Sequence, residues 1–311
     1  MKQQLLLNPP GVINYYTNPF QVRKWLGLLE PDQITGFRIK PGLRLDRHTL
    51  GFSFSSNGLG LRGPCAQEAD NMIVGTSYAM SFTVDNGRNW YEQGFAPHAW
   101  LNLGLPVGLP QIEELFRRYY RGAAGVALVL YHPNYWVTTR NYEKWRMRGA
   151  TVFETFNWET DLRRCFRLYA KKLKRQNVDI EAGRVILFKH AGVKYHVNAE
   201  YNYFEFDKHP DIVALTVRSL HRMVERFMRI VVVRAQIKQE LVPEKHRNGT
   251  LVRTLESYRI GWQIIKKEIQ CFRQVEFHEA DGFTLEDFQP YDTHWNATGN
   301  ARFSEFVRKI L

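Results

Sequence analysis

Cysteine is scarce in this chain. Its 311 residues include three cysteines that are far apart and form no C-x-x-C pair: Cys65, Cys165 and Cys271. An odd, widely spaced set argues against a disulfide framework and against a cysteine-based zinc site. His190, His196 and His209 have neither a tight ligand spacing nor a nearby cysteine, so we expect no metal site there. No P-loop or other cofactor motif is visible, and we expect no cofactor.

Long apolar runs are also missing. No stretch approaches the roughly 20 apolar residues that a membrane-spanning helix needs. The first ten residues hold a three-leucine run that ends at Asn8-Pro9-Pro10, which is too short for the apolar part of a signal peptide. We therefore expect a cytoplasmic protein, and leave open a peripheral association with a membrane through basic residues.

Acidic residues are outnumbered by basic ones. Lys and Arg total 43, Asp and Glu total 31, and the net charge is +12. This excess favours a negatively charged partner, such as nucleic acid, an anionic polysaccharide or a membrane surface, although a generally basic protein is an equally good explanation. Charge is the only feature that favours nucleic acid, so we do not expect nucleic acid as the partner.

Short apolar runs alternate with amphipathic segments from residue 71 onward. We expect strands at 72–74, 98–103, 125–131, 230–233 and 274–277, and helices at 86–94, 109–120, 209–228, 250–270 and 298–311. The run Gly125–Tyr131 is apolar almost throughout, as a strand buried on both faces requires. The alternation predicts an α/β fold with helices packed on a parallel sheet.

Composition divides the chain into three parts. Residues 1–56 are rich in Gly, Pro and aromatics, and predict an irregular lead-in packed on the main domain. Residues 57–136 and 209–311 carry the α/β alternation. Residues 137–208 interrupt it with basic and aromatic residues, and predict an insertion that acts as a cap or partner surface. A solvated helix face beside a small core is the simpler explanation of that insertion.

Two local structures are expected inside the insertion. A helix at 161–174 carries six basic residues, and a hairpin pairs 185–190 with 193–196 around a turn at Ala191-Gly192. Basic residues between aromatic ones can stack on sugars or bases and attract phosphate or carboxylate. The insertion is therefore a candidate for substrate or partner contact.

A candidate site residue follows each of three expected strands. Ser77 comes after the first strand, Gly104 after the second and Asn134 after the third. Because the carboxyl ends of parallel strands lie at one edge of a sheet, these residues should meet there. The segment after Ser77 can also begin a helix, whose free N–H groups would favour negative charge beside the hydroxyl.

Asp292 and His294 lie two residues apart, just before the last expected helix. A serine hydroxyl is a weak nucleophile that needs an adjacent base, and the base needs a group to orient it. Taken alone, Ser77 fits a turn, His294 a surface histidine and Asp292 a helix cap. Taken together, the three residue types predict nucleophilic catalysis.

Six short segments resemble blocks of the SGNH (GDSL-like) hydrolase superfamily. They are residues 57–64 (NGLGLRGP), 75–77 (GTS), 84–90 (VDNGRNW), 102–104 (NLG), 132–134 (HPN) and 292–295 (DTHW). The first resembles the N-x-x-G-x-R-G-P segment before the nucleophile strand, and Gly75-Thr76-Ser77 stands where the family has Gly-Asp-Ser. The last has the shortened D-x-H-W form of relatives that modify polysaccharides. The blocks lie within 57–136 and 291–311.

The resemblance implies a three-layer α/β/α fold of flavodoxin-like type. It implies a serine-dependent acyl-ester hydrolase or O-acyltransferase, such as an O-acetyltransferase, that acts on a carbohydrate or polysaccharide through an acyl-enzyme. Ser77, His294 and Asp292 would be catalytic, and the N–H groups of Ser77 and Gly104 with the Asn134 side chain would form the oxyanion hole. The alternative is a weak or inactive module of the same fold that binds an anionic glycan or nucleic acid.

Two positions depart from the family pattern. Thr76 replaces the usual aspartate, and Tyr291 stands where the commoner D-x-x-H spacing would place its aspartate. Neither change removes a reacting group. The residues expected to contact substrate lie within or close to the blocks: Thr76, Tyr78, Trp136 and Trp295.

Overall fold

The computed structural model of the chain describes residues 29–32, 36–46, 52–63, 67–81, 84–94, 99–105, 107–147, 182–290 and 292–311. The expected helix at 161–174 and most of the expected lead-in lie outside the described residues. Among the described helices, none is both long and apolar enough to cross a membrane.

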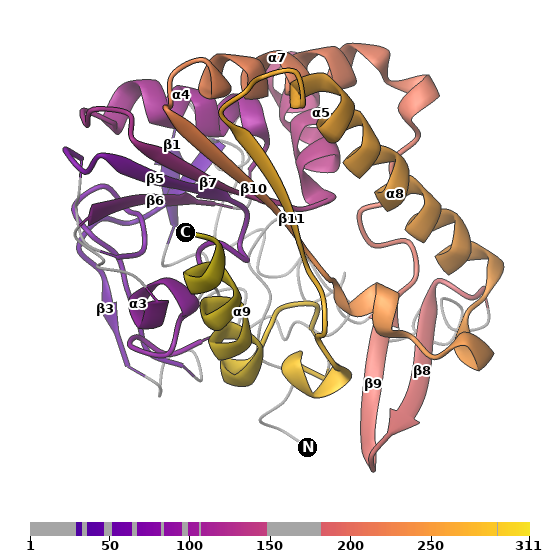
Figure 1. Cartoon of the computed structure of the whole chain (residues 1–311). Helices are drawn as coiled ribbons and strands as arrows, with labels where there is room; N and C mark the ends of the chain where they lie inside the picture. Colours follow the sequence, from indigo (N-terminus) through magenta and orange to yellow (C-terminus); the bar gives the residue numbers. More distant parts are fainter. Residues whose placement is uncertain are drawn as a thin grey trace, which may run out of the picture.

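A five-stranded parallel sheet forms the centre of the molecule (Figure 1). In spatial order its strands are β11 (Val275–Ala280), β10 (Arg229–Ala235), β7 (Val126–Tyr131), β5 (Asn71–Gly75) and β6 (Trp100–Gly104). The chain enters the sheet at β5, adds β6 on one side and then crosses to β7 on the other. This is the flavodoxin-like order, in which the first strand of the sheet along the chain, here β5, lies inside the sheet.

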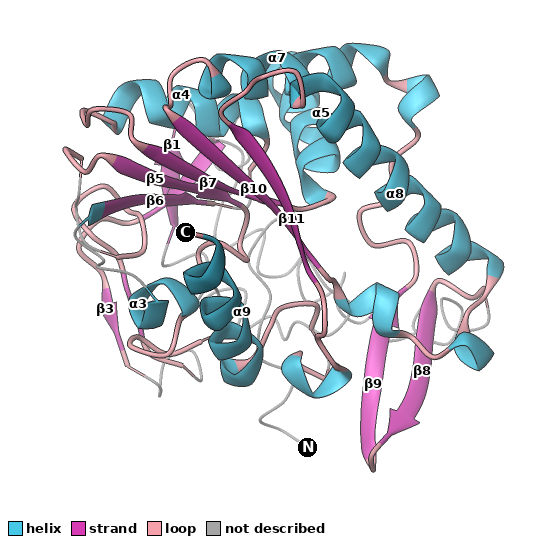
Figure 2. Cartoon of the chain, viewed as in Figure 1, coloured by secondary structure: helices cyan, strands magenta, loops and turns pink. Residues whose placement is uncertain are grey.

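Helices cover both faces of the sheet (Figures 1 and 2). One layer holds α4 (Leu109–Tyr119), α5 (Asn134–Met147), α7 (Pro210–Val224) and α8 (Gly249–Ile269), and the other holds α3 (Trp90–Gly94) and α9 (Ala297–Ile310). Successive strand residues face opposite layers: Val129 and Val232 join the first core, whereas Leu128 and Val231 join the second. The predicted three-layer α/β/α fold is confirmed.

The helix expected at 86–94 is shorter than predicted. Asn89 ends the preceding turn, and its side-chain oxygen accepts the N–H of Glu92 at 2.9 Å. An asparagine that caps the free N–H groups of a first helical turn marks the start of the helix. For this reason α3 begins at Trp90.

The expected insertion is joined more closely to the sheet than its composition predicts. Its boundary at residue 137 falls inside α5, which covers the sheet from Asn134 to Met147. The expected hairpin is present as β8 (Val185–His190) and β9 (Val193–Asn198), and Figure 1 shows it projecting beyond α8. The hairpin shares a small core with Val242, Leu251 and Leu285 of the main domain.

Short elements complete the described chain. Antiparallel pairs are formed by β1 (Leu29–Asp32) with β2 (Gly36–Ile39) and by β3 (Arg44–Leu45) with β4 (Phe54–Ser55). Short 3-10 helices are η3 (Phe206–Lys208), η4 (Lys238–Leu241), η5 (Glu244–His246) and η6 (Leu285–Asp287). The segment between β11 and α9, which carries part of the candidate site, contains η6 and is contacted by Lys238 of η4.

Candidate active site

The carboxyl ends of β5 and β7 meet where the strand order reverses. Val74 of β5 pairs with Val129 of β7, and Ser77 and His132 each lie three residues beyond that pair. Ser77 and the segment His132-Pro133-Asn134 therefore lie side by side at the carboxyl edge of the sheet. Ligands of doubly wound sheets bind in the crevice at such a reversal point.

Ser77, His294 and Asp292 are joined by hydrogen bonds. His294 Nε2 lies 2.7 Å from Ser77 Oγ, and His294 Nδ1 lies 2.5 Å from Asp292 Oδ1. The three residues are 5%, 3% and 6% exposed, respectively. Because the carboxylate accepts a hydrogen bond at Nδ1, the favoured tautomer carries its proton there and leaves Nε2 free to accept the serine proton.

The acid–base segment, residues 289–294, is held between η6 and α9. Its ends are closed by the bond from Gln289 N–H to the His294 carbonyl at 2.9 Å and by a bridge between Phe288 and Trp295. The helix cap is Asn296 rather than Asp292, since the Asn296 side chain accepts the first free N–H groups of α9. Asp292 is therefore left to bond the histidine.

The segment after Ser77 does not begin a helix, so that expectation is wrong. It forms turns, and Ser81 takes a left-handed φ of 51°. The carbonyl oxygens of Met80, Ser81 and Val84 accept hydrogen bonds from the buried guanidinium of Arg62 at 3.3, 2.5 and 2.6 Å. Carbonyls turned towards Arg62 are not available for a helix, and the hydroxyl gains no helix dipole.

Gly104 is placed differently from the expectation. Its N–H donates to Asn102 Oδ1 at 2.8 Å, and Asn102 Nδ2 donates to the Ala79 carbonyl at 3.1 Å. A side chain at position 104 would come within 2.5 Å of the Met80 nitrogen, so glycine is required for this close approach. The N–H of Gly104 is therefore already bonded and is not directed at the serine in this conformation.

His132 is a buried residue of the site that the sequence analysis did not single out. Its Nδ1 accepts the Asn134 N–H at 3.1 Å, and its ring stacks on Tyr78 at a centroid distance of 4.6 Å. Burial, together with the nearby His294, lowers the pKa of His132 to about 3, so the ring is neutral. An accepting Nδ1 puts the proton on Nε2, which is buried and makes no hydrogen bond within the described part of the chain. Its only sequence signal was its place beside Asn134.

The four expected substrate contacts are all buried. Tyr78 donates its hydroxyl to the Thr293 carbonyl, and burial raises its pKa, so the phenol stays protonated. Trp295 stacks on Phe283 in the core beneath α9. Thr76 is fully buried. Trp136 lies in the core on the other face of the sheet, where Phe204 and Phe206 pack against it. It is therefore separated from Tyr78 and Trp295.

Lys238 of η4 is a second residue that sequence reasoning missed. It is fully buried, and its Nζ lies 2.7 to 3.1 Å from four main-chain carbonyl oxygens: those of His196, Gln289, Pro290 and Asp292. Burial lowers the pKa of Lys238 to about 7, while the nearby Asp292 acts in the opposite direction. No pattern around position 238 distinguishes this lysine from a surface lysine.

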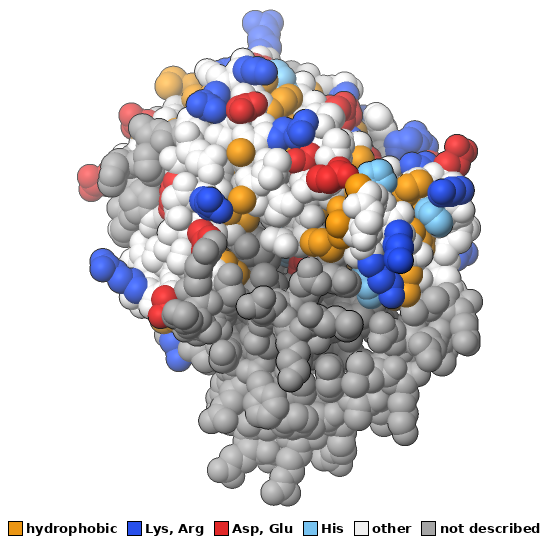
Figure 3. Space-filling view, turned by 90° about the horizontal axis from the view of Figure 1, so that it is seen from below, with side chains coloured by type: hydrophobic (Ala, Val, Ile, Leu, Met, Phe, Trp, Pro, Cys, Tyr) orange, Lys and Arg blue, Asp and Glu red, His pale blue; other side chains and the backbone are white. Residues whose placement is uncertain are grey.

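The surface charge does not single out a partner. In the face shown in Figure 3, the Lys and Arg side chains are spread among Asp and Glu instead of forming one patch. Within the described residues, no group of three or more His, Cys, Asp or Glu side chains is arranged to bind a metal ion.

Comparison with known proteins finds only distant structural likeness. No protein family and no curated protein matches the sequence. A solved structure of a candidate platelet activating factor from Streptococcus pneumonia is 12% identical, with a TM-score of 0.40 over 78% of this chain and 84% of the other. A carbohydrate esterase family 2 enzyme with its carbohydrate-binding domain, from Corynascus thermopiles (Myceliophthora fergusii), is 9% identical, with a TM-score of 0.35 over 77% and 64%. Both are too distant to indicate what this chain acts on.

Proposed function

We propose that this chain is a serine-dependent acyl-ester hydrolase or O-acyltransferase. The observation that carries the proposal is the hydrogen-bonded series from Asp292 through His294 to Ser77, with distances of 2.5 and 2.7 Å. A nucleophile bonded to a base that is itself oriented by a carboxylate is the arrangement that activates serine.

The reaction proceeds in two steps. Ser77 Oγ attacks the ester carbonyl while His294 Nε2 takes the hydroxyl proton, and Asp292 stabilises the imidazolium. Collapse of the tetrahedral intermediate breaks the bond to the leaving alcohol, which receives the proton from His294. Water, or a hydroxyl group of an acceptor, then attacks the acyl-enzyme with the same histidine as base, and Ser77 is released.

Two hydrogen-bond donors are available to the oxyanion while the N–H of Gly104 is bonded to Asn102. We assign the developing negative charge to the N–H of Ser77 and the side-chain amide of Asn134, because these residues follow the adjacent strands β5 and β7. The N–H of Gly104 can join them only when it leaves Asn102 Oδ1. Loss of one such donor lowers kcat by a factor on the order of 10² to 10³.

We propose a carbohydrate or polysaccharide ester as the substrate, with acetyl as the acyl group. Support comes from the resemblance of residues 292–295 to the D-x-H-W block, and from the net charge of +12, which favours anionic chains. The choice between hydrolase and transferase depends on whether an acceptor hydroxyl displaces water from the acyl-enzyme.

Turnover of p-nitrophenyl acetate tests the proposal. We expect activity in the purified protein and background rates in Ser77→Ala and His294→Ala. Asp292→Asn should lower kcat by about 10⁴, because an amide N–H that donates to Nδ1 favours the tautomer with its proton on Nε2, where it cannot accept the serine proton. Equal rates in all four proteins would overturn the proposal. Acetate release from an acetylated oligosaccharide, measured with and without an unacetylated one, then separates hydrolysis from transfer.

A further inference from the structure

Lys238 lies at a junction of three segments. Three of its four carbonyl partners belong to the acid–base segment: Gln289 at 2.7 Å, Pro290 at 2.7 Å and Asp292 at 2.9 Å. The fourth is His196 of β9 at 3.1 Å, whose own N–H donates to the Pro290 carbonyl at 3.0 Å. One ammonium group thus connects η4, the hairpin and the loop that carries Asp292.

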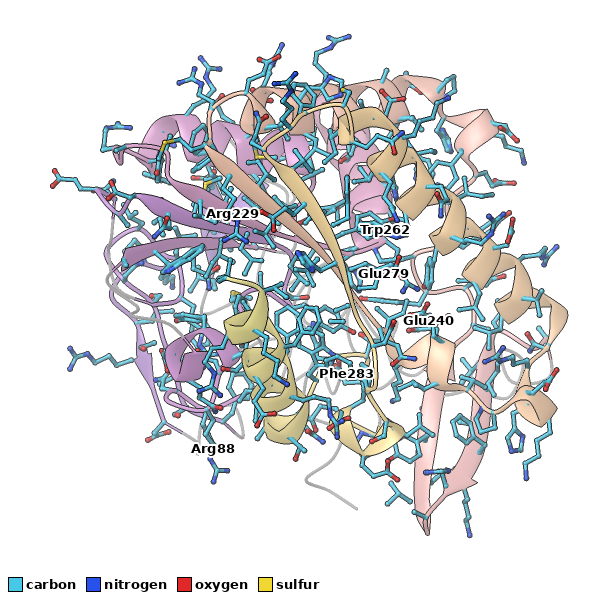
Figure 4. The ribbon with its side chains drawn as sticks, in the orientation of Figure 1. Arg88, Arg229, Glu240, Trp262, Glu279 and Phe283 are labelled. Carbon is cyan, nitrogen blue, oxygen red and sulfur yellow. The ribbon has the colours of Figure 1, made fainter. Side chains whose placement is uncertain are left out.

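The position of the ammonium group is itself fixed. The Glu240 carboxylate accepts a hydrogen bond from Arg234 of β10 and another from the Ile237 N–H at 2.9 Å. Arg234 also bonds Glu279 of β11, and Figure 4 shows Glu240 and Glu279 beside that strand. On its other side, Nζ lies 5.4 Å from the centre of the Tyr195 ring, within the range of a cation–π contact. Lys238 is therefore attached to the central sheet and not to a free loop.

The four carbonyl oxygens around Lys238 can stay this close together only because a cation lies between them. Four carbonyl oxygens within 3.1 Å of one point repel each other, and each would lose a hydrogen bond to a charged donor if the ammonium group were removed. Conversely, a buried ammonium group is costly unless its N–H groups are all bonded. The loop conformation and the charge therefore depend on each other.

We infer that Lys238 is a positioning residue: its ammonium group, bound by four main-chain carbonyls, holds the acid–base segment so that Asp292 and His294 stay in line with Ser77. This inference rests on the proposed function. It adds that the catalytic geometry is set from β10 and the β8–β9 hairpin, outside the blocks that carry the family resemblance.

The test replaces Lys238 with Met, which keeps the length of the side chain and removes the charge. We expect kcat for p-nitrophenyl acetate to fall about 10²-fold with KM changed less than threefold, because a small misplacement of a catalytic group has an effect of that size. Lys238→Arg keeps a charged donor and should retain at least a tenth of the wild-type kcat. The control is Ile112→Ala, a change at a buried residue of α4 that lowers stability away from the junction.

A second readout needs no activity. Amide hydrogen exchange of Gln289, Asp292 and His196 should be at least tenfold faster in Lys238→Met, since their N–H bonds lie within the junction, and unchanged in Ile112→Ala. If Lys238→Met does not fold, Lys238→Gln takes its place, because it offers two N–H donors without charge.

The outcomes separate the inference from the proposed function. A wild-type enzyme that is active, with Lys238→Met equally active, would overturn the positioning role alone. A wild-type protein without turnover would overturn the proposed function. In that case unchanged exchange at the three amides in Lys238→Met would also show that Lys238 does not hold the acid–base segment. Faster exchange would support that role.

Discussion

Two segments bring Ser77, His294 and Asp292 together, and a buried cation holds each segment. The serine segment is held by Arg62, whose guanidinium bonds three carbonyls in the turns after Ser77. The acid–base segment is held by Lys238, whose ammonium group bonds four carbonyls, three of them in residues 289–292. In both cases a cation replaces the helix or strand that would otherwise satisfy the carbonyl groups.

The two cations differ in what they can do. A guanidinium group has five N–H donors in a plane and stays charged, even though burial lowers the pKa of Arg62. An ammonium group is a compact point charge, and burial brings the pKa of Lys238 to about 7. The serine segment is thus held in a way that pH does not alter, whereas the acid–base segment depends on a group that can lose its charge.

Replacement of Arg62 should have the largest effect on stability. Arg62→Met removes a charged hydrogen-bond donor from three carbonyls and should reduce stability by about 3 kcal/mol, as the removal of a buried charged partner does. We expect kcat to fall about 10²-fold, with faster amide exchange near Met80–Ser81 and none of the change at residues 289–292 that Lys238→Met produces. Denaturant unfolding and hydrogen exchange measure both quantities.

Arg62→Lys sharpens the same comparison. One ammonium group cannot span the carbonyls of Met80, Ser81 and Val84 as the fork of guanidinium nitrogens does, so this variant should recover less than half of the lost stability. Full recovery would show that charge alone holds the serine segment and that the distinction between the two cations is wrong.

A smaller effect concerns His132, which lies between the two segments. Its pKa is about 3 when folded and about 6.5 when unfolded, so between these pH values the unfolded chain binds a proton that the folded chain does not. The stability this residue provides is present above pH 6.5 and is lost as pH falls, by up to about 1.4 kcal/mol per pH unit.

His132→Phe should flatten that dependence. The variant keeps a stacking ring beside Tyr78 but cannot be protonated, so the free energy of unfolding should change less between pH 7 and pH 4.5 than in the wild type. Denaturant unfolding at several pH values measures the slope. Val193→Ala, at an exposed apolar position of the hairpin, is the control and should leave the slope unchanged. Identical slopes in wild type and His132→Phe would contradict the assignment.

The layers of the fold could be predicted because the apolar runs are strong. Ile230–Val233 and Val126–Tyr131 are buried on both faces by two helical layers, which is what such runs require. The rule that the strand ends of a parallel sheet share one edge predicted that Ser77 lies near Asn134, whereas Asp292 and His294 were linked to Ser77 by their residue types and by the family resemblance. These features depend on local pattern and on one topological rule.

Other features depend on contacts distant in the sequence and could not be predicted. The segment after Ser77 was predicted to begin a helix. It forms turns instead because its carbonyl groups accept hydrogen bonds from Arg62, which the local sequence does not reveal. Gly104 looked like a free donor because the side chain of its neighbour Asn102 is oriented by the Ala79 carbonyl, 23 residues away. Lys238 carries no local signal, since its partners lie 42 to 54 residues away.

The most direct test of the account is to label the protein with a fluorophosphonate probe and locate the adduct by peptide mass spectrometry. Ser77 should carry a single adduct that disappears in His294→Ala, because only a hydroxyl bonded to that base is activated. Ser81, a buried serine in the same turns, is the internal control and should stay unlabelled. No adduct on Ser77, or equal labelling in the presence and absence of His294, would contradict the central claim.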